Sequence, residues 1–170
     1  APVVSLHAIA GIRTEDTMLV PVYIHGHRLT ALLDSGSTHN FVHVHLMRRM
    51  GLATSTTKTH VTVANGDRVP CGVVARNIAM HIGKEEYTIS CLGIDLGGFD
   101  VILCVDCLRT LGPILWDFED LCMAFTWHGR RVFWQGIGSP RDDIFESSLR
   151  VLAADPKRSL LDVLLQQYDD

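Results

Sequence analysis

The sequence predicts a mainly β protein, folded as a closed sheet or barrel, on three observations. Short apolar runs rich in β-branched residues recur along most of the chain. Several of these runs are joined by glycine-containing turns that are typical of β-hairpins. The 170 residues can bury a sizeable core, and 47% of them are hydrophobic against 20% charged, which indicates one ordinary globular domain with a tail.

Composition also limits the kinds of binding partner and the cellular compartment that we expect for this protein. The net charge of −4 offers no basic field for nucleic acid, so we expect no nucleic-acid partner from this region. No apolar run is long enough to span a bilayer, and the N-terminus does not resemble a signal peptide. The five cysteines are Cys71, Cys91, Cys104, Cys107 and Cys122. Their odd number and loose spacing favour buried thiols and a reducing, intracellular and cytoplasmic location.

The N-terminal half contains a leader, a hairpin and a helix in our interpretation. Residues 1–16 have weak periodicity and are expected to be a leader with at most one short strand. "MLVPVYI" and "RLTALL" are expected to be strands around a tight turn at His25-Gly26. The stretch "NFVHVHLMRRMG" ends in basic residues and Gly51, which predicts a short helix that closes on a glycine with positive φ.

The following segments predict further short strands and their turns. "KTHVTVA" and "RVPCGVV" flank Asn65-Gly66-Asp67, a strong hairpin signal, and "ARNIAMHI" and "YTISCLGI" flank Gly83-Lys84. "FDVILCVDCLRTLG" is expected to begin as a buried strand and to end as a short helix. "LCMAFTW" and "RRVFWQ" predict a last hairpin around His128-Gly129. The main domain is thus expected over 17–138, followed by a linker and helical connector over 139–170.

The stretch "ALLDSGST" carries the candidate chemistry at Asp34. Asp, Ser and Gly commonly form turns, yet this triplet with two preceding apolar residues and a following hydroxyl should occur by chance in about one chain in a thousand. Two carboxylates held about 3 Å apart share one proton, so one can act as base on water while the other polarises a carbonyl. Gly36 would permit close backbone approach, and the hydroxyls of Ser35 and Ser37 would tie down the crossing loop and the carboxylate.

The sequence contains a single triplet of this kind. The nearest second candidate, Asp95-Leu96-Gly97, lacks the hydroxyl residue. Because one carboxylate cannot form a pair, the partner of Asp34 must come from a second copy of the chain related by twofold symmetry.

Four segments in order resemble the protease region of gypsy-type LTR retrotransposon Gag-Pol polyproteins: "ALLDSGSTHNF", "VTVANGDRV", "DLGGFDVIL" and "LRTLGPILWDF". The resemblance extends from "SLHAIAGI" to the tail. It implies a retropepsin-like closed barrel with one or two short helices and a C-terminal helical tail that leads toward reverse transcriptase. It also implies an aspartic endopeptidase that works as a homodimer on its own polyprotein, without metal or organic cofactor.

The resemblance assigns roles by position. Asp34 matches the catalytic aspartate, with Ser35 and Gly36 completing its triplet and Ser37 supporting it. The hairpin tip matches the flap that closes over a bound peptide: Ala64, Asn65, Gly66 and Asp67. An apolar strand matches the support beneath the active-site loop: Val101, Ile102, Leu103 and Cys104.

Two positions depart from the family pattern. Cys104 stands where the supporting strand usually continues into glycine, and Cys107 stands where an aromatic residue is usual. A side chain at a glycine packing position could crowd the loop beneath Asp34, at a typical cost of ~1–3 kcal/mol. The second hypothesis is therefore a catalytically decayed copy that acts only as a folding and dimerisation module.

A third, weaker hypothesis is a thiol or zinc protein. Cys104 and Cys107 have the spacing of a redox or zinc motif but lack a second pair, and their predicted burial favours a structural role. His39, His43 and His45 include an i, i+4 pair that could bind metal on a helix. No acid lies between them as in zinc proteases, so we interpret them as solvated surface histidines.

Overall fold

The computed structural model describes residues 1–138, and the predicted linker and helical connector lie outside this range. The chain forms two compact units, of which the first is Ala1–Thr110 and the second begins at Leu111. The first unit therefore includes residues 1–16, the expected leader, and the division at Leu111 falls inside the domain predicted over 17–138. None of the helices in residues 1–138 is long and apolar enough to cross a membrane.

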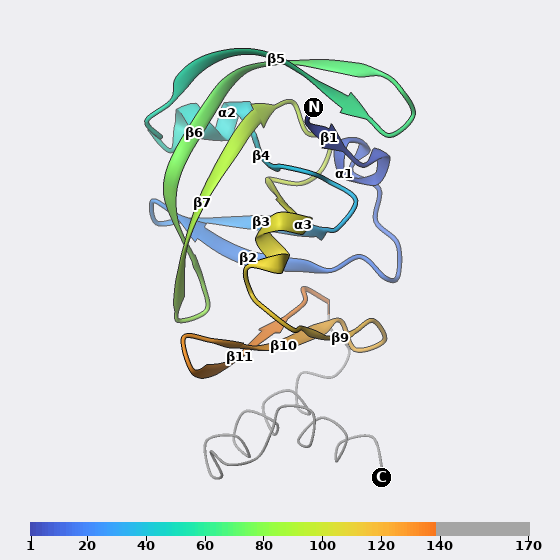
Figure 1. Ribbon diagram of the computed structural model, residues 1–170, viewed down its shortest axis with the longest axis vertical. Helices are drawn as coiled ribbons and strands as arrows, with labels where there is room; N and C mark the ends of the chain where they lie inside the picture. Colours follow the sequence, from blue (N-terminus) through green and yellow to red (C-terminus); the bar gives the residue numbers. More distant parts are fainter. Residues whose placement is uncertain (139–170) are drawn as a thin grey trace. The chain divides into compact units, whose positions relative to one another are not determined.

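Six strands of the first unit close into a barrel, as predicted (Figure 1). Neighbouring strands pair in the order β6, β2, β3, β8, β4 and β7, and β7 pairs with β6 to complete the ring. Most pairs are antiparallel, but β3–β8 and β4–β7 are parallel. The six strands are β2 (Leu19–Ile24), β3 (His27–Asp34), β4 (Asn40–His43), β6 (Arg68–Ile82), β7 (Glu85–Ile94) and β8 (Val101–Cys104).

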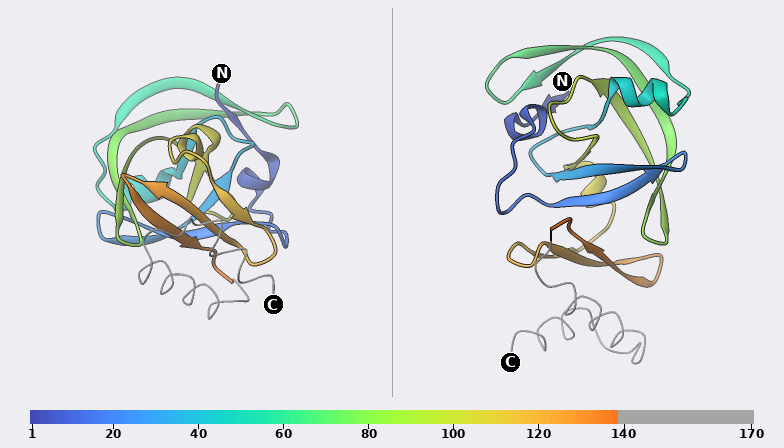
Figure 2. Two further views of the ribbon diagram at one scale, coloured as in Figure 1. Left: turned by 60° about the horizontal axis from the view of Figure 1, so that its bottom comes forward. Right: turned by 180° about the vertical axis from the view of Figure 1, so that it is seen from behind.

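Two further strands extend the sheet beyond the barrel. β5 (Ser55–Val63) pairs antiparallel with β6, and β1 (Val3–Val4) adds to β5 in parallel. Both views in Figure 2 show the β5–β6 arm projecting from the barrel near the N-terminus. The arm is thus a two-stranded extension whose edge is covered by the start of the chain.

Turn chemistry explains the hairpins. His25 and Gly26 have φ values of 49° and 77°, so the turn between β2 and β3 has the two left-handed residues that match strand twist. The predicted strands "RVPCGVV" and "ARNIAMHI" are wrong as separate elements, because β6 runs through both as one strand of 15 residues. Its register shifts between Ala75 and Ile78, and Asn77 has φ 55°, so a bulge bends the strand without ending it.

Three short helices accompany the barrel: α1 (Leu6–Ala10), α2 (Val44–Arg49) and α3 (Val105–Arg109). α3 follows β8 as predicted. The helix predicted over "NFVHVHLMRRMG" forms only from Val44, and Gly51 follows it with φ 67°. Its first four residues are instead the barrel strand β4, because Phe41 and Val42 are fully buried between β7 and β8.

An apolar cluster in the core of the first unit reaches from the N-terminal residues to β8. It consists of Val4, Ala8, Leu19, Leu32, Phe41, Val61, Val63, Cys71, Ile94, Leu96, Phe99 and Ile102. Val4 and Ala8 are fully buried in it, so the expected leader over 1–16 contributes to the packing of the unit. The reason is the pairing of β1 with β5, a long-range contact.

The described part of the second unit is a three-stranded antiparallel sheet. β10 (Cys122–Trp127) and β11 (Arg130–Gln135) form the predicted hairpin around His128-Gly129. β9 (Leu115–Asp117), which we did not predict, pairs with the other edge of β10. Phe125 packs edge-on against Trp134 with ring centroids 5.0 Å apart.

Candidate active site

Asp34 is the last residue of β3, at the point where the parallel strands β3 and β8 end together. The two strands pair from Ala31 and Val101 to Asp34 and Cys104. The chain leaves β3, forms a short loop and returns as β4 on the other side of β8. The predicted support residues of β8 are fully buried beneath this loop: Val101, Ile102 and Leu103. Asp34 thus lies at the end of a buried pair of parallel strands.

Three donors hold the Asp34 carboxylate. The Gly36 N–H donates to Oδ1 at 3.0 Å. The hydroxyls of Ser37 and Ser5 both donate to Oδ2, each at 2.6 Å. Hydrogen bonds to an ionised group are short and strong, so the three together fix the orientation of the carboxylate.

The loop after Asp34 is tightly built. A Cβ on Gly36 would lie 3.2 Å from Asp34 Oδ1, so this position favours glycine for close approach. Ser37 is fully buried, and its carbonyl accepts from the Val105 N–H at the start of α3 at 3.2 Å. Ser35 and Gly36 are exposed and Asp34 is partly exposed, so the turn presents the carboxylate at the protein surface.

Cys104 does not disturb this loop. Cys104 is only 3% exposed, and its backbone N–H donates to Asn40 Oδ1 at 2.9 Å. The pairing of Cys104 with Asp34 and the donation from Gly36 to Asp34 are both present with the thiol in place. The hydrogen bonds that hold the Asp34 loop are thus formed with the Cys104 side chain buried beside β3.

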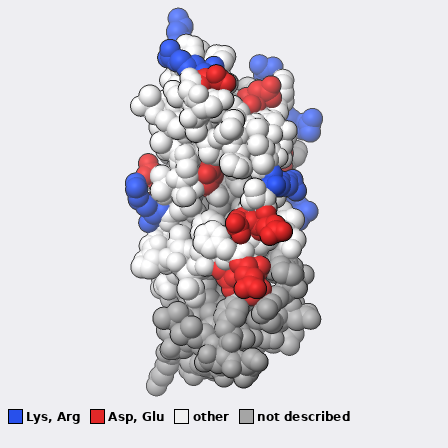
Figure 3. All heavy atoms as spheres, turned by 90° about the vertical axis from the view of Figure 1, so that its right-hand side faces the viewer, with Lys and Arg blue, Asp and Glu red and all other residues white. Residues whose placement is uncertain are grey.

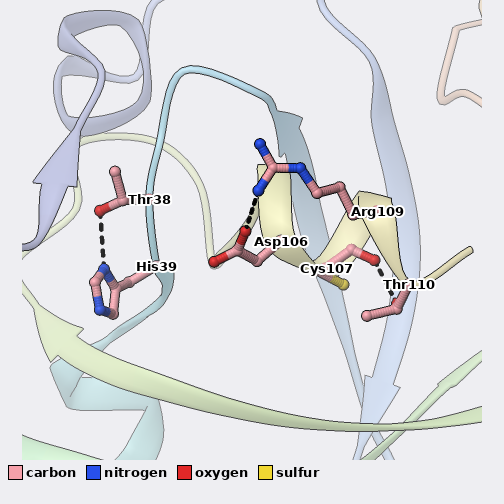
Figure 4. A network of polar contacts seen from close by, with 6 residues as sticks. All are labelled: Thr38, His39, Asp106, Cys107, Arg109 and Thr110. Atoms are coloured by element: carbon pink, nitrogen blue, oxygen red, sulfur yellow. Dashed lines mark hydrogen bonds and ion pairs between the residues drawn. The ribbon is translucent and has the colours of Figure 1, made fainter.

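Cys107 lies on α3, where Figure 4 shows the last turn closed by a hydrogen bond from the Thr110 hydroxyl to the Cys107 carbonyl, at 2.6 Å. Asp106 and Arg109 form an exposed ion pair of 2.8 Å on the same helix. Burial, with a smaller contribution from Cys104, raises the pKa of the Cys107 thiol to about 12. This thiol is therefore protonated at neutral pH, which suits the structural interpretation of the Cys-x-x-Cys spacing.

The histidines predicted as an i, i+4 pair on a helix do not lie on one. His39 precedes β4 and His43 ends it, and only His45 belongs to α2. His43 Nε2 lies 3.3 Å from Asp95 Oδ1. Within residues 1–138, no three His, Cys, Asp or Glu side chains gather as metal ligands.

The predicted flap is the tip of the β5–β6 arm. Asn65 accepts from the Asp67 N–H with Oδ1 and donates to Asp67 Oδ2 with Nδ2, both at 3.0 Å. The Gly66 N–H donates to the Val63 carbonyl at 2.8 Å. All of Ala64 to Asp67 is exposed, so the tip is a self-contained turn at the end of a projecting hairpin.

Ser5 is the site residue that sequence reasoning missed. Its hydroxyl donates to Asp34, and its own N–H donates to Ser37 Oγ at 3.2 Å. It also caps α1, because its Oγ accepts from the Ala8 N–H at 3.2 Å. The sequence did contain a signal for the short helix that Ser5 begins: a serine suited to an N-cap is followed six residues later by Gly11, suited to a left-handed C-cap.

Charged side chains are sparse on the face that lies to the right in Figure 1. Figure 3 shows that both signs are interspersed there among uncharged residues in the described part of the chain. This face of the described residues therefore carries no field of one sign.

Comparisons with known proteins agree with this fold. Residues 2–113 match the family model described as retroviral aspartyl protease. The retroviral protease-like domain of Ddi1 from Leishmania major has a TM-score of 0.58 at 15% identity, over 75% of this chain and 97% of that one. Among the curated proteins, no sequence matches.

Two other solved structures have lower scores. EIAV protease complexed with the inhibitor HBY-793 has a TM-score of 0.49 at 20% identity, over 61% of this chain and 96% of that one. A retropepsin-like aspartic protease from Rickettsia conorii has a TM-score of 0.48 at 16% identity, over 66% and 84%. The match of the family model spans most of the sequence and includes the Asp34 loop and the barrel around it, so this chain belongs to the retroviral aspartyl protease family.

Proposed function

We propose that this chain is an aspartic endopeptidase in which Asp34 and the Asp34 of a second copy activate one water between them. One carboxylate takes a proton from the water, and the other, protonated, polarises the carbonyl of the scissile peptide bond. The observation that carries the proposal is the fixed, partly exposed carboxylate of Asp34 at the paired ends of β3 and β8.

A second carboxylate of the same chain does not serve this role in our proposal. Asp95, the other candidate, has a side chain 83% exposed and lies beside His43. Proteases of this family function as dimers and act on polypeptides. The exposed Ser35 and Gly36 leave the turn accessible to a second copy, which supports a homodimer whose two Asp34 side chains meet at the twofold axis.

The remaining residues hold and cover the site. Gly36 and Ser37 orient the carboxylate, and the turn from Ala64 to Asp67 would close over the bound peptide as a flap.

The biological setting is also part of the proposal. The resemblance of the four segments to gypsy-type elements supports a retrotransposon Gag-Pol protease that cuts its own polyprotein. The decayed-copy alternative rests on Cys104, and the intact hydrogen bonds around Cys104 do not favour it.

The test is Asp34→Asn in the purified full chain, with Asp95→Asn as the matched control. Asp34→Asn should abolish pepstatin-sensitive peptide cleavage while its circular dichroism spectrum stays that of the folded wild type. Asp95→Asn should retain the cleavage. Equal cleavage by Asp34→Asn and the wild type would refute the assignment.

A further inference from the structure

We propose that residues 2–10, called here the N-terminal segment, occupy the place of a bound peptide beside the Asp34 of their own chain and leave it when a substrate binds. The inference rests on the proposed peptidase function and concerns the regulation of the same site. The segment consists of β1, Ser5 and α1, and it is joined to β2 by an exposed stretch over 12–16. Three walls of the site contact it.

The first wall is the loop that follows Asp34. The Thr38 N–H donates to the Val3 carbonyl at 2.9 Å, and the Val3 N–H donates to Thr38 Oγ1 at 2.7 Å. The Ser5 N–H donates to Ser37 Oγ at 3.2 Å. One edge of the extended segment is thus bound along the catalytic loop, as a peptide added to a sheet edge would be.

The second wall is the β5 strand of the flap arm. The N–H groups of Thr62 and Ala64 donate to the carbonyls of Pro2 and Val4, at 2.9 and 3.1 Å. β1 therefore has hydrogen-bond partners on both edges, the catalytic loop on one and the flap arm on the other. Figure 1 shows β1 next to the β5–β6 arm. A substrate strand covered by this flap would need the same donors.

The third wall is the loop before β8, which contacts α1. The Gly97 N–H donates to the Ile9 carbonyl at 2.8 Å, and a Cβ on Gly97 would lie 2.7 Å from that oxygen. A Cβ on Gly11 would lie 2.7 Å from the Gly98 nitrogen. The backbone after α1 and the backbone at Gly97 and Gly98 pack directly against each other, so the loop before β8 holds the C-terminal end of the segment.

The N-terminal segment also forms a hydrogen bond with the Asp34 carboxylate. Ser5 Oγ donates to Asp34 Oδ2 at 2.6 Å, on the same oxygen that Ser37 already contacts. Gly36 and Ser37 belong to the catalytic loop, whereas Ser5 belongs to the segment. Departure of the segment frees a lone pair of Oδ2 for a water or a substrate group, so the self-bound state is the inactive one.

Val4 indicates which peptides compete with the segment. Its side chain is fully buried in the apolar core cluster and directly precedes the residue that faces Asp34. A competing peptide should therefore carry a branched aliphatic residue immediately before the residue that contacts Asp34. A charged residue at that position would be excluded by the cost of burial.

Because the N-terminal segment is covalently joined to the barrel, a weak intrinsic affinity is enough to keep it bound at the site. A segment on a short linker has an effective concentration of about 1 mM. A segment that fills the site about ten to one by this mass action raises the apparent KM for a peptide about tenfold. The kcat of the emptied site is unchanged.

The experiment cuts the tether in the full chain. A recognition sequence for a specific protease is inserted within the exposed stretch 12–16, and the released segment is removed by dialysis. The KM for a peptide substrate should fall about tenfold after cutting, with kcat unchanged. A synthetic peptide of residues 1–13 should restore the higher KM competitively, and its Ser5→Ala version should do so less well. The matched control carries the same insertion in the exposed turn at His128-Gly129 and should show no change on cutting.

Pepstatin binding gives a readout that does not depend on turnover. Calorimetry should show about tenfold tighter pepstatin binding after the cut in 12–16. If the cut protein binds pepstatin more tightly but cleaves no peptide, the proposed function fails and the self-bound segment stands. If cutting leaves both KM and pepstatin affinity unchanged, or abolishes pepstatin binding, the segment is a structural part of the site and the inference is overturned.

Discussion

The buried hydroxyl of Ser37 provides a direct test of how Asp34 is held. It donates to Asp34 Oδ2 at 2.6 Å and accepts from the Ser5 N–H at 3.2 Å. Ser37→Ala removes both hydrogen bonds and leaves the Cβ in place. The variant therefore isolates the hydroxyl from the packing of the loop.

The magnitude follows from the two bonds. A hydrogen bond to a charged group contributes about 1.5–3 kcal/mol and a neutral one about 0.5–1.5 kcal/mol. Because Asp34 is partly exposed, water can replace part of the lost donation, so we expect a loss of about 2 kcal/mol in the free energy of unfolding. For a chain of this size, that loss lowers the melting temperature by roughly 4–8 °C.

Thermal and urea unfolding measure this loss against Ser55→Ala, an exposed serine at the start of β5. Surface substitutions of that kind change stability by no more than about 0.5 kcal/mol. The double variant Ser5→Ala/Ser37→Ala should lose an amount that differs from the sum of the single variants, because both hydroxyls donate to the same oxygen, Asp34 Oδ2. Equal stability of Ser37→Ala and Ser55→Ala, or strict additivity of the pair, would contradict the reasoning.

The other predictions concern the glycine of the loop and the thiols. Gly36→Ala should strongly reduce peptide cleavage, because its Cβ would lie 3.2 Å from Asp34 Oδ1, whereas Gly72→Ala, whose Cβ meets nothing within 4 Å, should retain it. Cys91, Cys107 and Cys122 should react with iodoacetamide at pH 8 far more slowly in the folded than in the urea-unfolded protein, since burial raises each pKa to about 12; comparable rates would refute this. The three raised thiol pKa values contribute to the stability of the folded state at any pH below the ordinary thiol value of 9.0. This contribution is lost as the pH rises toward 12, because the thiols of the unfolded chain ionise first. Urea unfolding should therefore show a lower free energy of unfolding at pH 10 than at pH 7.

Local chemistry made much of the barrel predictable. The hairpin turns at His25-Gly26, Asn65-Gly66 and His128-Gly129 are set by residues that accept left-handed backbone conformations, and all three are present. The position of Asp34 at the end of a buried strand followed from the apolar run before it. These features depend on neighbours in sequence.

Features that depend on distant contacts were not predictable. The helix α1 has five residues and is held by the loop at Gly97 and by the pairing of β1 with β5, so weak periodicity in residues 1–16 concealed it. β4 was included in the predicted helix because the stretch ends in basic residues and Gly51, but its burial between two strands makes it a strand. The contact of Ser5 with Asp34 joins residues 29 positions apart, which no local pattern reports.

Mixing wild-type and Asp34→Asn chains tests the central claim, a hydrolytic centre shared by two copies. Equal amounts are unfolded, combined and refolded together, and peptide cleavage is compared with that of the same total amount of wild type. Random pairing places two intact carboxylates together in about one quarter of the dimers, so the account predicts about one quarter of the activity. An activity of about one half would show that each chain works alone, and would contradict it.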